Sequence, residues 1–182
     1  FHLPKLPHSI LIEGGGYVGV EFATIFAGLG VKTTLVYRGE RVLRGFDEDM
    51  REGLDAGLET RGISRIYQTS VTALRKAGDD VVVRFSDGVE APYGAVMFAT
   101  GRHPNIHGFG LAEAGVTLDP ATGAIAVDRF SQTSVPSIYA VGDVTGRAAL
   151  TPVAIREGAA FAETVFNDNP TAVDHSLIPT AV

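Results

Sequence analysis

The chain has 182 residues, 45% of them hydrophobic, and a formal net charge of −6. This is enough for one large domain, or for one domain with part of another. The negative charge argues against nucleic acid or an anionic membrane as a partner, and no apolar run approaches membrane-spanning length. Because the N-terminus lacks the features of a signal peptide, the expected location is the cytoplasm. The sequence has no cysteine, which excludes thiol chemistry by this chain alone, and its five histidines lack metal-ligand spacing, so we expect no metal site.

The N-terminal part of the chain reads as a strand, a glycine-rich turn, a helix and a second strand. Residues 9–12 are a short apolar run, typical of a strand buried in a parallel sheet. Apolar residues then recur at helical spacing until Gly30, and residues 31–36 are β-branched and apolar. The turn between the first strand and the helix contains Gly14, Gly16 and Gly19. This order predicts a dinucleotide-binding βαβ unit.

Each glycine of the turn has an expected role. Gly14 permits a tight turn, Gly16 lets a pyrophosphate approach the backbone, and Gly19 lets the helix pack against the sheet. The motif accepts glycine or alanine at the last position, so we expect Gly19→Ala to be tolerated. Glu13 is unexpected beside this turn, because its carboxylate would repel a pyrophosphate unless it points away.

The end of the second strand distinguishes two cofactors. Sites for NAD usually place an acidic residue there, whereas sites for NADP place groups that bind a phosphate. Here Tyr37 holds that position, Arg38 follows it, and Arg44 can reach back from the next turn. A guanidinium matches a phosphate in charge and geometry. The sequence therefore predicts NADPH as the nucleotide, with both arginines at its 2′-phosphate.

The rest of the chain adds helices and strands of two kinds. Residues 47–60 predict a helix capped by Asp47, and residues 151–166 predict an apolar helix. Alternating patterns and turn signals predict further strands at residues 63–67, 71–74, 81–85, 89–91, 96–99 and 137–141. We expect the strand at residues 96–99 to be buried. The predicted fold class is α/β: a Rossmann-like three-layer dinucleotide-binding domain with an antiparallel β-meander at residues 1–102, followed by residues 103–182, which the resemblance described next implies to be a partial FAD-domain segment.

Four motifs, in this order, resemble those of the FAD-dependent pyridine nucleotide-disulfide oxidoreductases. They are GGGYVGVE at residues 14–21, ATGRHPN at 99–105, TSVPSIYAVGD at 133–143 and LTPVA at 150–154. Arg38 with the run RGFD at residues 44–47 is most similar to the glutathione reductases of that family. The NADH-linked dihydrolipoamide dehydrogenases carry an acidic residue near position 37 instead.

The resemblance implies a role for each matching residue. Tyr17 would cover the nicotinamide pocket, and Glu21 would lie near the nicotinamide end. Asp143 would accept a hydrogen bond from the ribityl chain of FAD, and the helix starting at Thr151 would point its N-terminus at the flavin. The remaining cofactor-binding residues implied by the motifs are Val18, Gly101 and Arg102.

The resemblance also implies a central portion of a larger, homodimeric flavoenzyme. Family members carry a redox-active cysteine pair before this region and an active-site His-Glu pair after it, on the dimerisation domain, whose start the chain would reach. In the parent, NADPH would pass hydride to FAD, the flavin would reduce a disulfide, and the resulting dithiol would reduce oxidised glutathione. This chain alone would be inactive. The alternatives are a dihydrolipoamide dehydrogenase, a ferredoxin or quinone reductase, and an isolated binding module without turnover.

Overall fold

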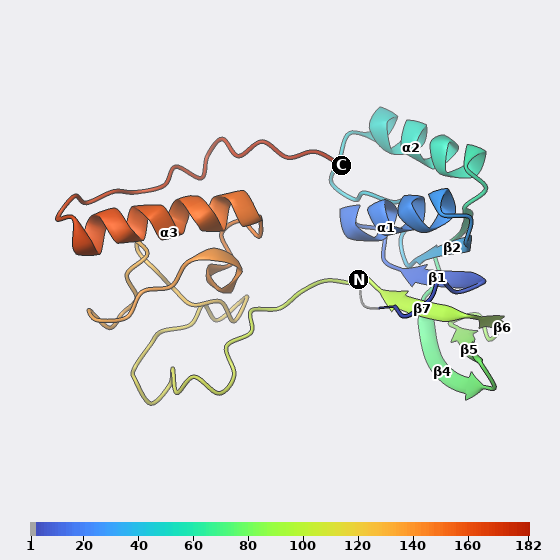
Figure 1. Ribbon diagram of the computed structural model, residues 1–182, viewed down its shortest axis with the longest axis horizontal. Helices are drawn as coiled ribbons and strands as arrows, with labels where there is room; N and C mark the ends of the chain where they lie inside the picture. The colour runs from blue at the N-terminus through green and yellow to red at the C-terminus, as the bar shows by residue number, and fades with distance from the viewer. Residues whose placement is uncertain (1–2) are drawn as a thin grey trace. The chain divides into compact units, whose positions relative to one another are not determined.

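The computed structural model describes residues 3–182 of the chain. These residues form two compact units: an N-terminal unit that ends at Gly101 and a C-terminal unit that runs from Arg102 to Ala181 (Figure 1). Within residues 3–182, none of the helices is long and apolar enough to cross a membrane.

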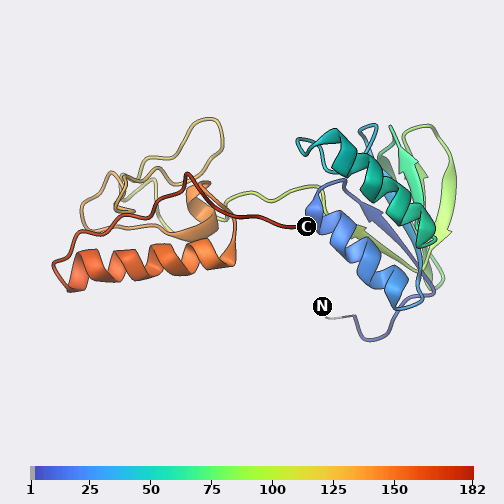
Figure 2. The same ribbon diagram turned by 90° about the horizontal axis from the view of Figure 1, so that it is seen from above.

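A parallel sheet and two helices form the first part of the N-terminal unit. Every neighbouring pair of strands in the sheet is parallel, and the order is β3-β2-β1-β7. The helices connect consecutive strands and lie on the same face of the sheet (Figures 1 and 2). The elements are β1 (Ser9–Glu13), α1 (Tyr17–Gly28), β2 (Lys32–Tyr37), α2 (Glu48–Thr60), β3 (Ser64–Tyr67) and β7 (Ala95–Phe98).

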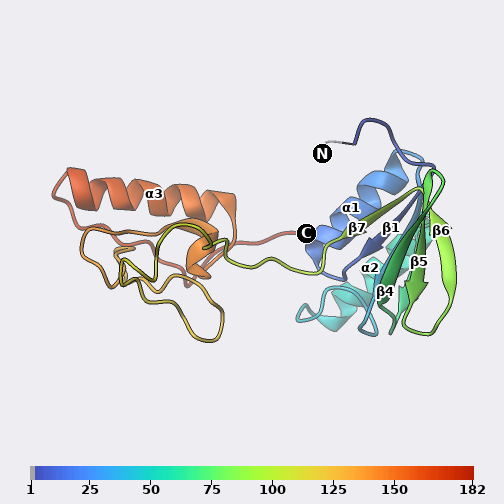
Figure 3. The ribbon, with the colours of Figure 1, turned by 90° about the horizontal axis from the view of Figure 1, so that it is seen from below.

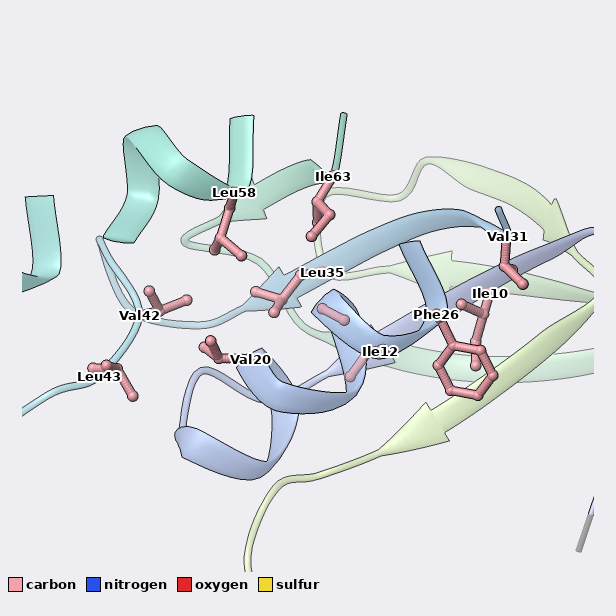
Figure 4. Close-up of a cluster of buried hydrophobic side chains, with 11 residues drawn as sticks. Ile10, Ile12, Val20, Phe26, Val31, Leu35, Val42, Leu43, Leu58 and Ile63 are labelled. Carbon is pink, nitrogen blue, oxygen red and sulfur yellow. The ribbon is translucent and has the colours of Figure 1, made fainter. Parts of the chain in front are cut away.

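The opposite face of this sheet carries an antiparallel meander, seen from below in Figure 3. Its strands are β4 (Val71–Ala77), β5 (Asp80–Phe85) and β6 (Glu90–Tyr93). Leu11 and Val36 of the parallel sheet pack against Val83 and Phe85 of the meander. A larger core on the helical face includes Ile12, Val20, Leu35 and Leu58 (Figure 4). The three layers confirm the predicted α/β fold with its meander.

The helix ends follow the residues expected from the sequence. Asp47 caps α2 through its Oδ1, which accepts hydrogen bonds from the backbone N–H groups of Asp49 and Met50 at 3.1 and 3.4 Å. Gly30 follows α1 and Gly62 follows α2, with φ of +81° and +71°. Glycine reaches this left-handed conformation without steric cost, so the chain can turn at the end of each helix.

The last strand of the sheet differs from the prediction. We expected residues 96–99 to be buried, but β7 is only half-buried and the side chain of Phe98 is 51% exposed. The reason is its place in the strand order, because β7 pairs with β1 alone and lies at the edge of the parallel sheet.

The C-terminal unit is mostly loops around a small apolar cluster that includes Val116, Ile125 and Ala140. Its regular elements are a 3-10 turn, η1 (Gly142–Thr145), and the helix α3 (Thr151–Phe166), which has the predicted bounds. The predicted strand at residues 137–141 is wrong. A strand needs a neighbouring ladder of hydrogen bonds, and among the described residues this segment makes a single bridge, from Tyr139 to Gln132.

Candidate functional site

Two of the three motif glycines are required by packing within the chain. The N–H of Gly14 donates to Val36 O at 3.0 Å, and Gly14 has a φ of +140°. A Cβ on Gly14 would lie 2.3 Å from Ala99 O, and a Cβ on Gly19 would lie 2.2 Å from Gly14 O. Both neighbours are backbone atoms, which cannot turn aside. An alanine at position 19 would therefore fit only if the helix or the turn shifted, which contradicts the expectation that Gly19→Ala is tolerated.

Gly16 is different, because nothing in the described part of the chain requires a glycine there. Its φ is −83°, and an added Cβ would meet no atom of residues 3–182 within 4 Å. Gly16 is exposed and is the N-cap of α1, where no side chain of residues 3–182 caps the helix and no acidic residue occupies the first turn. The free N–H groups and the positive end of the helix dipole therefore face an open position that suits an anion.

The first turns of α1 present two polar side chains to solvent. Tyr17 is 39% exposed, and Glu21, one turn later on the same side of the helix, is also exposed. Within residues 3–182, neither side chain makes a hydrogen bond or an ion pair. Val18, between them, is half-buried. Tyr17 and Glu21 are thus available to a ligand near the N-terminus of α1.

The end of β2 is tied to the glycine turn. A Cβ on Gly15 or on Gly39 would lie 2.5 Å from the ring of Tyr37, so the ring lies between these two glycines. The N–H of Leu43 donates to Gly15 O at 2.6 Å, and Leu43 is buried with a φ of +53°. A non-glycine residue in this conformation is unusual and is held by its surroundings. The loop from β2 to α2 is therefore anchored to the glycine turn.

The arginines of this loop and of the first turns of α2 fall into two groups. Glu48 binds Arg41 and Arg51, each with an N–O distance of 2.5 Å, and Arg51 also donates to the carbonyl groups of Val42 and Arg41 at 2.8 and 2.9 Å. Arg38 and Arg44 are exposed, and within residues 3–182 neither makes an ion pair. The sequence-predicted phosphate ligands are therefore the two arginines that the fold leaves free.

Glu13 does not face the anion position. Strand side chains alternate between faces, and Glu13 shares the face of Leu11, which packs on the meander. Its Oε1 accepts a hydrogen bond from the N–H of Val71, at the start of β4, at 3.0 Å. The unexpected carboxylate thus joins the parallel sheet to the meander. Sequence reasoning could not assign this role, because Val71 is distant along the chain.

The predicted flavin-contacting residues in the C-terminal unit lie close together. Asp143 is in η1, and its carboxylate is 3.3 Å from Arg102 Nη1. Arg102 Nη2 also donates to Ala149 O at 3.2 Å, just before α3. Thr151 is the exposed first residue of α3, which has no side-chain cap. Both halves of the ion pair remain more than half exposed, so Asp143 stays accessible to a ligand. Gly101, the last residue of the N-terminal unit, is exposed with a φ of +136°.

Known proteins similar to this chain are disulfide reductases. The chain is 45% identical to a glutathione reductase of a Nostoc strain and 48% identical to that of Burkholderia cepacia; each match covers the whole chain but 42% and 40% of the relative. The trypanothione reductase of Trypanosoma congolense is 42% identical, with 38% of it covered. The chain therefore spans about two fifths of the length of these relatives.

The chain is also similar to solved structures. The flavoprotein disulfide reductase RclA of Escherichia coli matches with a TM-score of 0.85 and 28% identity, over 94% of this chain and 38% of that one. LpdA of Mycobacterium tuberculosis matches with a TM-score of 0.84 at the same identity, over 94% of this chain and 37% of that one. The sequence profile of one family matches residues 1–158. The chain belongs to the pyridine nucleotide-disulphide oxidoreductase family.

Proposed function

We propose that this chain is the NADPH-binding portion of a flavin-dependent disulfide reductase. The observation that carries the proposal is Gly16, a glycine for which the described chain gives no internal reason. A bound pyrophosphate supplies that reason, because it would take the open position in front of the uncapped N-terminus of α1. Gly14 and Gly19 shape the turn, while Tyr17, Val18, Glu21 and Gly101 would line the nicotinamide side.

Arg38 and Arg44 would bind the 2′-phosphate and so select NADPH over NADH. Both are exposed and unpaired within residues 3–182, whereas Glu48 holds Arg41 of the same loop and Arg51 of α2. The bond from Leu43 to Gly15 fixes the residue before Arg44 against the glycine turn. This anchoring lowers the entropy that Arg44 would lose on binding a phosphate.

The C-terminal unit would supply part of a flavin site. FAD, when bound, would accept hydride from the nicotinamide and pass electrons on to a disulfide. The residues that fit this group are Asp143, whose exposed carboxylate can accept a hydrogen bond from a ribityl hydroxyl, and the uncapped N-terminus of α3 at Thr151. Arg102 would hold Asp143 in place through their ion pair. Residues 1–102 and 103–182 are our proposed division into nucleotide and flavin portions.

For the whole protein we propose a homodimeric reductase of oxidised glutathione. The glutathione reductases that are 45% and 48% identical to this chain support this substrate. Trypanothione reductases, at 42% and 44% identity, make a related disulfide the second candidate. Reduction of the substrate disulfide by a pair of thiols would require cysteines, of which this chain has none.

Cofactor choice tests the nucleotide assignment. We expect calorimetry to show tighter binding of NADPH than of NADH, and Arg38→Ala with Arg44→Ala to remove most of that difference. Two charge-assisted contacts are worth on the order of 3 kcal/mol or more, about a hundredfold in Kd. Arg41→Ala is the matched control, because that arginine lies in the same loop but is bound to Glu48. Equal affinity of the unmodified chain for the two nucleotides would refute the assignment.

A further inference from the structure

The C-terminal unit contains a fully buried carboxylate that the proposed site does not use. Glu157, on α3, is 1% exposed. Its Oε2 accepts a hydrogen bond from the N–H of Gly142 at 2.6 Å. Its Oε1 lies 3.0 Å from Arg147 Nη2 and 2.7 Å from His175 Nε2. A buried charge is costly unless it is paired and hydrogen-bonded, so this set of partners explains how the carboxylate is accommodated.

The Gly142 contact acts on the turn that carries Asp143. Gly142 is buried with a φ of +76°, and a Cβ there would lie 3.2 Å from the Cβ of Ala154, so the turn packs tightly on α3. Thr145 Oγ1 closes the turn by donating to Gly142 O at 2.8 Å. Glu157 therefore fixes the backbone of the residue immediately before Asp143.

Arg147 extends the same network around the turn. Its Nε lies 3.2 Å from Thr145 Oγ1, and its Nη2 lies 3.0 Å from Ser131 Oγ. The guanidinium thus joins both ends of the network, the Thr145 end of the turn and the Glu157 carboxylate. Removing the carboxylate would leave Arg147 without its anionic partner as well as releasing Gly142.

The third partner of Glu157 belongs to the segment after α3, residues 167–176. This segment runs back along the helix, because the N–H of Thr171 donates to Thr164 Oγ1 at 3.0 Å and the N–H of Asn169 donates to Glu163 O at 3.1 Å. His175 then reaches Glu157, two turns before Thr164. The carboxylate is therefore the place where the C-terminal segment and the Asp143 turn meet.

We propose that Glu157 is a positioning residue for the flavin site, which holds the Gly142–Asp143 turn in place and is itself held by His175 of the C-terminal segment. The inference rests on the proposed function, since it assigns Asp143 to the flavin. Glu157 does not touch the flavin in this proposal. It acts through Gly142, so that the conformational ordering of residues 167–176 affects how rigidly Asp143 is held at the flavin site.

Amide exchange followed by NMR on the 182-residue chain tests the proposal. We expect Glu157→Gln to accelerate exchange of the Gly142 N–H by roughly fivefold to tenfold, because glutamine keeps an acceptor oxygen but not the charge, and a hydrogen bond to a charged group is stronger than one to a neutral group. The amide resonances of Gly142 and Asp143 should also shift. The N–H of Val116, which donates to Leu111 O at 2.9 Å, is the internal reference and should be unchanged.

Glu163→Gln is the matched control, because Glu163 lies on the same helix and, among residues 3–182, its carboxylate binds only Asn167 and Asn169 at the helix end. We expect it to leave the Gly142 exchange rate unchanged. His175→Ala should accelerate Gly142 exchange by a smaller factor than Glu157→Gln. Equal acceleration of Gly142 and Val116 in Glu157→Gln would overturn the proposal, since Glu157 would then stabilise the unit as a whole. No effect of His175→Ala would overturn the role of the C-terminal segment.

Titration of the same variants with NADPH keeps the two proposals separate. The nucleotide site lies in the N-terminal unit, so NADPH affinity should be the same in Glu157→Gln and in the unmodified chain. Failure of every form to bind NADPH would count against the proposed function. That failure would be recognised independently of the exchange rate at Gly142.

Discussion

Replacing Gly16 by alanine separates a glycine needed by a ligand from a glycine needed by the fold. The added Cβ would meet no atom of the described chain within 4 Å, and the φ of −83° is open to any residue. Alanine is a poorer N-cap than glycine, but it also restricts the unfolded chain, which stabilises by about 0.4–1 kcal/mol. These effects oppose each other. We therefore expect the free energy of unfolding to change by less than about 1 kcal/mol.

Nucleotide binding should respond much more strongly to the same methyl group. It would stand where a pyrophosphate approaches the N-terminus of α1, and displacing one phosphate oxygen from a backbone N–H costs about 1.5–3 kcal/mol. This corresponds to a loss of affinity on the order of ten- to a hundredfold. Calorimetric titration with NADPH measures the affinity, and urea unfolding followed by circular dichroism measures the stability.

Gly14→Ala is the contrasting variant. Its Cβ would lie 2.3 Å from Ala99 O at a φ of +140°, so both binding and stability should fall, the latter by more than about 2 kcal/mol. A folded Gly16→Ala chain that binds NADPH as tightly as the unmodified chain would refute the reasoning. The open position at Gly16 would then not be the pyrophosphate site.

Two further predictions concern stability. Glu13→Ala removes the acceptor of the Val71 N–H and should lower the free energy of unfolding by about 1–3 kcal/mol, whereas Glu13→Gln, which keeps an acceptor oxygen, should cost less. If the two variants unfold at the same urea concentration, Glu13 does not join the sheet to the meander. Asp47→Ala removes the cap of α2 and should cost about 1 kcal/mol in the same assay. An unchanged midpoint would show that the cap contributes nothing.

The sequence alone determined the local elements of this protein. The glycine turn, the two helices that flank β2 and the apolar helix α3 were predicted because helix periodicity, caps and turn glycines are properties of neighbouring residues. The predicted strand at residues 137–141 failed for the opposite reason. Strand formation depends on a partner elsewhere in the chain, and apolar composition does not supply one.

The tertiary structure decided which residues are available to a ligand. The sequence shows four arginines from Arg38 to Arg51, but only the fold shows that Glu48 holds two of them, while Arg38 and Arg44 make no ion pair within residues 3–182. Likewise, the sequence predicts roles for Gly14 and Gly16, but only the fold shows that Ala99 requires a glycine at the first position while nothing described in the chain requires one at the second.

Two carboxylates show most clearly the difference between what the local sequence predicts and what the tertiary structure determines. Glu13 was recognised as unexpected from its neighbours, but its partner Val71 lies on another strand. Glu157 gave no signal in the sequence, because its partners come from two segments on either side of α3, Gly142 and Arg147 before the helix and His175 after it. Burial of a charge and the direction of a side chain depend on contacts between residues far apart in sequence. Local pattern fixes the helices and turns, and only the folded chain determines what each charged side chain meets.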